Sequence, residues 1–171
     1  MEIIEDYAQF FTATLYEWKP VLAFPEVKKI ILDSLSFLYD QKRCYVYAFV
    51  IMNNHIHLIW QMREGHLLQD IQRDFLKFTA QKIKFFLQDH HSALLRELEV
   101  NLKDRKYQIW QRNSLNVPLY SEYVFQQQLD YIHQNPVKAG LCSFPSDYDY
   151  SSAQFYFKGV NKFNFLEHHE G

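Results

Sequence analysis

The hydrophobic pattern in the first third of the chain changes period several times. Residues 9–18, QFFTATLYEW, combine aromatic and β-branched side chains and predict a strand. In residues 26–41 the apolar side chains recur at steps of three and four, which predicts an amphipathic helix. Two further strand-like runs, 44–52 and 55–62, are separated by Asn53-Asn54, a pair that suits a tight turn. The pattern therefore predicts a strand, a helix and a hairpin.

A second helix and a fourth strand are predicted next. Residues 67–88 carry apolar side chains at helical spacing, and Gly65 is the break before them. Residues 106–111, KYQIWQ, have the composition of a strand. Both helix stripes are buried most simply on one face of an antiparallel sheet. We therefore predict an α+β fold, a ferredoxin-like βαββαβ sandwich.

A third helix is predicted towards the end of the chain, outside the βαββαβ unit. It runs from Ser121, a favourable N-cap, to Asn135, and Pro136 is expected to end it because proline disfavours a helical residue before it. A chain of 171 residues is long enough for one proper core and short for two. Residues 1–171 are therefore predicted to form a single domain with a C-terminal helix.

The composition is that of a folded globular protein. Hydrophobic residues make up 48% of the chain, with 15 Phe and 12 Tyr, while 4 Gly and 5 Pro argue against disorder. Cys44 and Cys142 fit no paired metal-ligand or redox spacing, so both are expected to be buried free thiols. No apolar run has the length of a membrane span, and the start of the chain is acidic, unlike a signal peptide. We expect a cytoplasmic protein with no membrane partner.

The charge balance gives no general attraction to nucleic acid. The formal net charge is −2, whereas phosphate contacts normally accompany an excess of Lys and Arg. A DNA-binding interpretation must therefore rest on local cation clusters. One cluster contains Lys77, Lys82 and Lys84, and another lies within residues 103–112. Ordinary solvated surface explains both clusters at least as well.

Two histidines lie one residue apart in the strand-like run IMNNHIHLIWQ. Alternate residues of a strand point to the same face, so His55 and His57 should project side by side. Neutral imidazole is the commonest metal ligand, and this spacing lets both rings reach one ion. Taken alone, the pair is explained more simply as hydrogen-bonded histidines on a half-buried strand. A metal site needs at least one further donor.

The predicted C-terminal helix contains a suitable donor. In LDYIHQNPVKAGL, Tyr131 and Asn135 are four residues apart and share one helical face. If Asn135 gives an amide oxygen to an ion, Tyr131 stands one turn away, close to whatever the ion binds. On its own such a pair is more often a surface hydrogen bond or a cap. Tyr123 with Gln127 has the same spacing and competes, whereas His133 points away from Tyr131 and is expected outside the site.

Several stretches of this sequence together resemble one family. YAFVIMNNHIHLIWQ resembles the HUH motif strand of the single-tyrosine, IS200-like transposases, and YIHQNPVKAGL resembles the catalytic helix of their REP-associated group. GHLLQDIQRDFLKFTAQKI is similar to the helix after the motif strand, IWQR to the next strand, and YDYSSAQFY to the C-terminal segment. The resemblance covers residues 8–157, and the pairing of HxH with YIHQNPVKAGL is specific to this family.

The resemblance implies a DNA strand-transfer enzyme, a nickase and ligase for single-stranded DNA at imperfect hairpins. By match to the motif, Tyr131 would be the nucleophile and would form a 5′-phosphotyrosine link. His55, His57 and Asn135 would hold a divalent metal, Mg²⁺ or Mn²⁺ in the family, that polarises the phosphate. Judged by chemistry alone, two imidazoles and an amide favour manganese or zinc. The family includes dimers and monomers, so a homodimer is open.

Single-stranded DNA also needs cations for its phosphates and flat surfaces for its bases. Trp60 and Trp110 are candidates for the second need, although core packing explains them better. The cations predicted to contact DNA are Lys77, Lys82, Lys84, Arg112 and Lys138.

Two other functions remain open from the sequence. One is a domesticated protein that keeps the fold and binds hairpin DNA with little or no cleavage. The other is a metal hydrolase in which His55 and His57 activate a water and Tyr131 is incidental. Formation of a covalent adduct with hairpin DNA separates these readings from a transposase.

Overall fold

A four-stranded antiparallel sheet organises the computed structural model, which describes residues 6–170. Its spatial order is β2-β3-β1-β4, the order of a ferredoxin-like βαββαβ unit, so the predicted fold class is confirmed. The strands are β1 (Gln9–Thr14), β2 (Cys44–Ile51), β3 (His55–Met62) and β4 (Leu115–Pro118).

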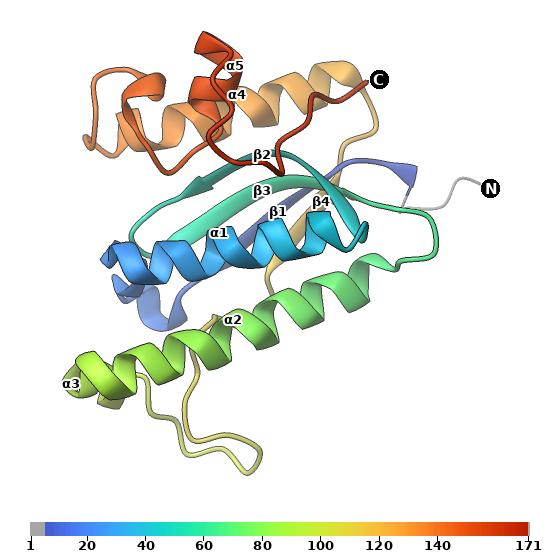
Figure 1. The fold of residues 1–171 in the computed structure, drawn as a ribbon. Helices are drawn as coiled ribbons and strands as arrows, with labels where there is room; N and C mark the ends of the chain where they lie inside the picture. The colour runs from blue at the N-terminus through green and yellow to red at the C-terminus, as the bar shows by residue number, and fades with distance from the viewer. Residues whose placement is uncertain (1–5, 171) are drawn as a thin grey trace.

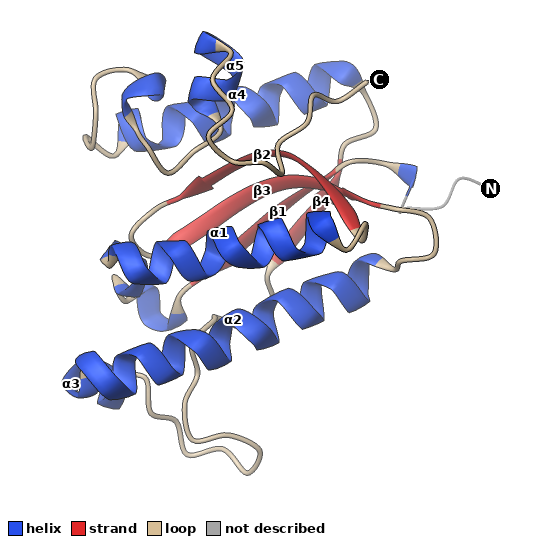
Figure 2. Cartoon of the chain, in the orientation of Figure 1, coloured by secondary structure: helices blue, strands red, loops and turns tan. Residues whose placement is uncertain are grey.

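Helices cover both faces of the sheet (Figure 1; Figure 2). Two long helices lie on one face, α1 (Pro25–Asp40) and α2 (Leu68–His90), with the short α3 (Ser92–Arg96) after them. The other face carries α4 (Glu122–Lys138) and α5 (Ala153–Lys158). Single 3-10 turns occur at Tyr16–Trp18, Val21–Ala23 and Pro145–Asp147. Among the described residues, no helix has the length and apolarity needed to cross a membrane.

The two-residue period of β1 divides its side chains between two cores. Phe11 and Ala13 join the core under α1 and α2, where Phe11 stacks on Trp60. Phe10 belongs instead to the smaller core under α4. Thr12 is on the same side of β1 as Phe10, because alternate residues share a face. A polar position therefore opens on the α4 side of the sheet.

The histidines lie on an interior strand. The hairpin predicted around Asn53-Asn54 is confirmed, since β2 and β3 pair antiparallel through Ile51 and Ile56. On its other side β3 pairs with β1, which sets His57 opposite Thr12. Because β3 is hydrogen-bonded to a neighbour on each edge, its backbone is fixed along its whole length.

The predicted fourth strand at residues 106–111 is wrong. That segment makes only isolated bridges, one of them between Trp110 and Leu15 beyond the end of β1. Asn113, with φ of 60°, then turns the chain, and pairing with β1 resumes at β4. Asn116 fixes this register, because its amide donates to Gln9 Oε1 at 2.8 Å and accepts from Gln72 at 2.7 Å. Four residues on a sheet edge give too short a pattern to predict from sequence.

The predicted end of the C-terminal helix at Asn135, the helix α4 in the structure, is also wrong. Ser121 caps the helix as predicted, accepting a hydrogen bond from the Val124 amide at 3.2 Å. The helix nevertheless continues through Pro136 to Lys138, although proline cannot donate a hydrogen bond to the Ile132 carbonyl. Gly140, with φ of 75°, ends it in a Schellman motif in which Leu141 donates to the Pro136 carbonyl at 2.9 Å.

The two cysteines are free thiols in the described structure, as predicted. Cys44 is buried in β2, and burial raises the pKa of its thiol to about 12. Cys142 is partly exposed in the loop after α4, which differs from the predicted burial. Neither thiol lines a candidate site.

Candidate functional site

A cavity of about 670 Å³ opens between the sheet and α4. It brings together the four residues predicted to form the site, His55 and His57 from β3 with Tyr131 and Asn135 from α4. The remaining lining residues are Phe10, Thr12, Thr14, Trp18, Leu115, Val117 and Gln128.

The tyrosine ring lies directly against the histidine pair. The ring centroids of His55 and His57 are 4.8 Å apart, and those of His57 and Tyr131 are 5.2 Å apart with planes at 69°. Phe10 stacks on His57 at 5.3 Å and meets the Tyr131 ring edge-on at 6.1 Å. The predicted association of the HxH strand with the tyrosine helix therefore exists within one chain.

His57, which lines the cavity, has one ring nitrogen without a hydrogen-bond partner in the described structure. The residue is 5% exposed, and its Nδ1 lies 2.7 Å from the Thr12 hydroxyl oxygen. Its Nε2 is buried and has no hydrogen-bond partner in the described structure. Burial, with a smaller effect of nearby His55, lowers the pKa of His57 to about 3. The ring is therefore neutral at physiological pH, the form in which imidazole binds metal.

His55 has a defined protonation state as well. Its Nδ1 lies 2.7 Å from Asn54 Oδ1, and because an amide oxygen only accepts, Nδ1 carries the proton and Nε2 the lone pair. Burial lowers the pKa of His55, while a hydrogen bond with the Asn135 side chain acts in the opposite direction. Asn135 therefore already reaches the imidazole with which it is predicted to share an ion.

The donor set fits a divalent cation with few protein ligands. No group of three His, Cys, Asp or Glu side chains in residues 6–170 is arranged to hold a metal. Two imidazoles and one amide oxygen would therefore have to be completed by water or by phosphate oxygens. The buried, unpartnered Nε2 of His57 is the observation that favours such an ion, since a buried polar atom without a partner is costly.

Three polar residues of the cavity, Thr12, Thr14 and Gln128, were missed from the sequence. Gln128 precedes Tyr131 by three residues, and the helical spacing that selects Asn135 also places Gln128 on that face. Thr12 and Thr14 are opposite His57 and His55 in the neighbouring strand, so only the strand register reveals them.

The competing helix residues lie outside the cavity. Tyr123 is 72% exposed, and its hydroxyl accepts a hydrogen bond from Gln127 at 3.1 Å. His133 is outside as predicted, but it is buried rather than solvated, with Nε2 2.8 Å from the Ser152 hydroxyl. Burial lowers the pKa of His133 to about 4. His133 therefore anchors α4 to the chain that follows it.

The predicted DNA-contacting cations do not surround the tyrosine. Lys77, Lys84 and Arg112 line one groove of about 830 Å³ between α2 and the 104–114 segment, on the sheet face opposite α4. Lys82 lies over the Phe78 ring instead. Lys138 is exposed at the end of α4.

The two tryptophans considered for base stacking, Trp60 and Trp110, are packed in the hydrophobic core. Trp60 is fully buried, and Trp110 is 7% exposed with its indole N–H donating to the Thr79 hydroxyl at 3.0 Å. Neither ring offers a face to DNA.

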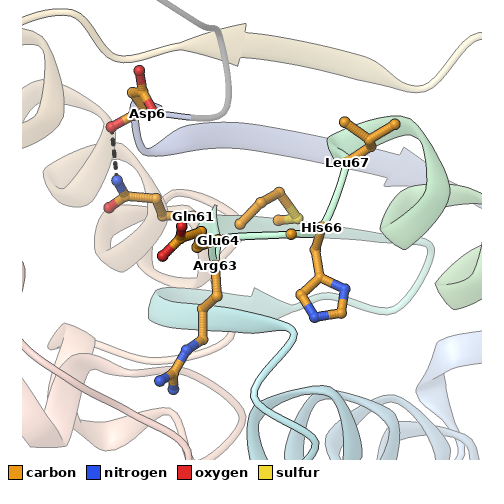
Figure 3. A pocket seen from close by; sticks show the side chains of 8 residues that line it. Asp6, Gln61, Arg63, Glu64, His66 and Leu67 are labelled. Carbon is orange, nitrogen blue, oxygen red and sulfur yellow. Dashed lines mark hydrogen bonds between the residues drawn. The ribbon is translucent and has the colours of Figure 1, made fainter.

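A second hollow of about 650 Å³ lies at the far end of β3, around residues 61–67 (Figure 3). Two of its polar side chains, Gln61 and Arg63, make contacts within the protein. The Gln61 amide donates to the Asp6 carbonyl at 2.7 Å and accepts from Tyr47, while the Arg63 guanidinium lies 4.6 Å from the Tyr45 ring centroid. This hollow lacks a converging set of reactive groups and is not a candidate site.

Known proteins resemble this chain in sequence and in fold. The chain is 33% identical over 107 residues to a Haemophilus influenzae protein provisionally named as a REP-associated tyrosine transposase. A solved REP-associated tyrosine transposase, bound to a REP hairpin, matches with a TM-score of 0.67 at 20% identity, over 96% of this chain and 93% of that one. The predicted resemblance to REP-associated tyrosine transposases is confirmed.

The extent of these matches differs. The Haemophilus alignment spans 61% of this chain and 56% of that relative. A solved structure described as a transposase from Deinococcus radiodurans aligns with 75% of this chain and 91% of its own, at 16% identity and a TM-score of 0.47. No protein-family model matches the chain. The resemblance to REP-associated tyrosine transposases therefore rests on one curated relative and on the fold.

Proposed function

We propose that this protein is a REP-associated tyrosine transposase that cuts and rejoins single-stranded DNA at imperfect hairpins. The observation that carries the proposal is the contact of Tyr131 with His57 in a cavity that also contains His55 and Asn135. A nucleophile, two neutral imidazoles and an amide oxygen are the parts that metal-assisted phosphoryl transfer to tyrosine requires.

The chemical step uses the phenol of Tyr131. Its oxygen forms a bond to the scissile phosphorus, and the bond from phosphorus to the 3′ oxygen breaks. The phenolic proton passes to water at the cavity mouth, and the departing oxygen takes up a proton to become a 3′-hydroxyl. The 5′ end of the DNA stays bonded to Tyr131 as a 5′-phosphotyrosine. The strand is rejoined when a 3′-hydroxyl loses its proton and forms a bond to that phosphorus, while the bond from phosphorus to the Tyr131 oxygen breaks and the phenol takes up a proton. The Tyr131 side chain is 43% exposed, so a DNA phosphate can reach it.

His55, His57 and Asn135 would hold a divalent cation, Mg²⁺ or Mn²⁺. When bound, such a cation polarises the phosphate oxygens and stabilises the charge that develops on them. The chain's own contribution is orientation. The Thr12 hydroxyl at 2.7 Å fixes the His57 ring, and Asn54 fixes His55 in the tautomer whose Nε2 carries the lone pair.

The DNA partner is proposed from both similarity and charge. The solved relative is bound to a REP hairpin. In this chain, Lys77, Lys84 and Arg112 gather in one groove despite the net charge of −2. We assign that groove to the phosphate backbone of DNA outside the cleavage position, since it lies across the sheet from Tyr131.

A covalent-adduct assay tests the proposal. Purified protein is incubated with single-stranded hairpin oligonucleotides from the repeats flanking its gene, with Mg²⁺ or Mn²⁺ and with a chelator. Denaturing gels should show a metal-dependent protein–DNA adduct that disappears in Tyr131→Phe. Tyr123→Phe is the matched control, because Tyr123 is an exposed tyrosine of the same helix outside the cavity.

Other outcomes identify the rival functions. Hairpin binding without adduct in the wild type would indicate a domesticated binding protein. Metal-dependent hydrolysis that persists in Tyr131→Phe would indicate a hydrolase that uses the histidines alone.

A further inference from the structure

One of the three tryptophans lies at the mouth of the cavity. Trp60 and Trp110 are buried, but Trp18 is 63% exposed and lines the cavity beside His55. The rings of Trp18 and His55 meet edge-on with centroids 6.1 Å apart. A large aromatic side chain therefore remains in water next to the proposed reaction centre.

The backbone holds Trp18 in a strained conformation. Both Glu17 and Trp18 have positive φ, 52° and 59°, a region that residues other than glycine rarely adopt. Such strain persists only where the surroundings enforce it, and it concentrates at functional sites.

Hydrogen bonds supply that enforcement. The Trp18 amide donates to the Leu15 carbonyl at 2.9 Å, and the Glu17 amide donates to Gln111 Oε1 at 3.2 Å. The Asn54 side chain, from the turn before the histidine strand, donates to the Trp18 carbonyl at 3.5 Å. The indole is thus presented by a fixed turn.

The cavity lining combines two kinds of side chain. Its polar groups include the histidines, Asn135 and Tyr131, where the proposed function places the scissile phosphate. Its exposed apolar groups are Trp18 and, from β4, Leu115 and Val117, which are 54% and 36% exposed. A nucleotide has the same two parts, a charged phosphate and a flat apolar base.

We propose that Trp18 is the stacking surface for the nucleobase next to the scissile phosphate. This subsite rests on the proposed function, because the phosphate position at Tyr131 brings the adjacent base to the cavity mouth. Stacking on an indole tolerates any base, so Trp18 would hold the strand without reading its sequence. The ligand is unpaired DNA, since a base within a duplex cannot offer its face to the indole.

Fluorescence quenching tests the subsite in the Tyr131→Phe background, which cannot form the adduct. Trp18 should dominate quenching by acrylamide because the other two indoles are buried. Binding of the hairpin oligonucleotide with its single-stranded flank should protect this emission. Trp18→Ala should weaken binding by roughly 5- to 100-fold, whereas Trp18→Phe should keep most of the affinity. Phe144→Ala, which removes a 68% exposed aromatic outside the cavity, should leave binding unchanged.

Single abasic substitutions along the flank locate the stacked base. At one position, loss of the base should make the wild-type Trp18 protein and Trp18→Ala bind equally. The subsite is refuted if Trp18→Ala loses the same binding affinity whichever DNA position is abasic. It is also refuted if bound DNA leaves the Trp18 emission accessible to acrylamide.

The two proposals fail separately. Equal affinity for the oligonucleotide in Trp18→Ala and in protein with Trp18 intact, with adduct formed by both when Tyr131 is present, refutes stacking and leaves the transposase proposal standing. Protection of Trp18 by DNA without any wild-type adduct refutes cleavage and leaves the subsite standing. Absence of any binding to the oligonucleotide refutes both.

Discussion

His57 and Tyr131 meet edge to face with ring centroids 5.2 Å apart, one on an interior strand and the other on a helix that covers the sheet. Because the contact uses the tyrosine ring, Tyr131→Phe should leave the free energy of unfolding within about 0.5 kcal/mol of wild type. Tyr131→Ala removes the ring and should cost roughly 0.5–1.5 kcal/mol. Urea denaturation measures both values. A strongly destabilised Tyr131→Phe would show that the hydroxyl, not the ring, holds α4 in place.

Thr12 should control metal affinity without touching the metal. Thr12→Val removes the hydroxyl that fixes His57, and loss of such a supporting contact typically weakens metal binding by about 10- to 100-fold. Titration of Mn²⁺ monitored by electron paramagnetic resonance gives the dissociation constant. Thr14→Val is the control, since Thr14 lines the same cavity without a hydrogen bond to either imidazole in the described structure. Equal affinities for both variants would exclude an orienting role for Thr12.

The hydrogen bond between His133 and Ser152 should contribute to the free energy of unfolding. Ser152→Ala leaves the buried Nε2 of His133 without its partner and removes the oxygen that accepts from the Phe49 amide at 3.1 Å. We expect a loss of about 1–3 kcal/mol in the free energy of unfolding. Ser143→Ala, at an exposed serine of the preceding loop, should change it by less than about 0.5 kcal/mol. Similar values for the two variants would contradict an anchoring role.

The groove beside α2 should contribute to the salt dependence of DNA binding. Replacing Lys77 and Lys84 together by Gln removes two cations, which should reduce the slope of log affinity against log salt by about 1.4 for single-stranded DNA. Fluorescence anisotropy at several salt concentrations measures the slope. Lys29→Gln is the control, because Lys29 is already paired with Asp33 on α1 at 2.6 Å. An unchanged slope in the double variant would place the DNA elsewhere.

Lys28 should make the free energy of unfolding depend on pH. The residue is 4% exposed, it donates to the Leu22 carbonyl and to Asn53 Oδ1, and its ammonium lies 5.1 Å from the Tyr150 ring centroid. Burial lowers the pKa of Lys28 below 10.5, so the unfolded chain binds its proton more readily. Between the lowered pKa and 10.5, the contribution of Lys28 to stability therefore rises with pH.

The comparison for this effect is Lys28→Met. The free energy of unfolding of the wild type, relative to the variant, should increase from neutral pH towards about pH 10. Urea denaturation at a series of pH values measures the difference. Parallel pH profiles for the two proteins would show that Lys28 has the same pKa folded and unfolded.

The sequence predicted each half of the site because each half lies on one regular element. A two-residue period places His55 and His57 on one face of a strand, and a step of four residues places Tyr131 and Asn135 on one face of a helix. Neither spacing predicts that the strand and the helix lie next to each other. The family resemblance supplied that association, and the cavity confirms it.

The features that the sequence did not predict depend on contacts between distant segments. β4 pairs with β1 over four residues, which give no period to recognise, and Asn116 joins it to Gln9 and Gln72. His133 is buried because Ser152 closes over it from the far side of a long loop. Trp18 lies in a turn in which Glu17 and Trp18 both have the left-handed backbone conformation, which residues other than glycine rarely adopt.

Because β3 lies between two strands, the two halves of the candidate site should unfold at different temperatures. The imidazole pair lies on backbone that is bonded along both edges, whereas α4 is held to the sheet through side-chain packing and contacts such as the one between His133 and Ser152. Local opening should therefore release α4 first, since elements without shared backbone bonds open at lower cost. Warming should then carry Tyr131 and Asn135 away together while His55 and His57 stay in register, so the proposed cleavage activity should be lost before the histidine pair is disrupted.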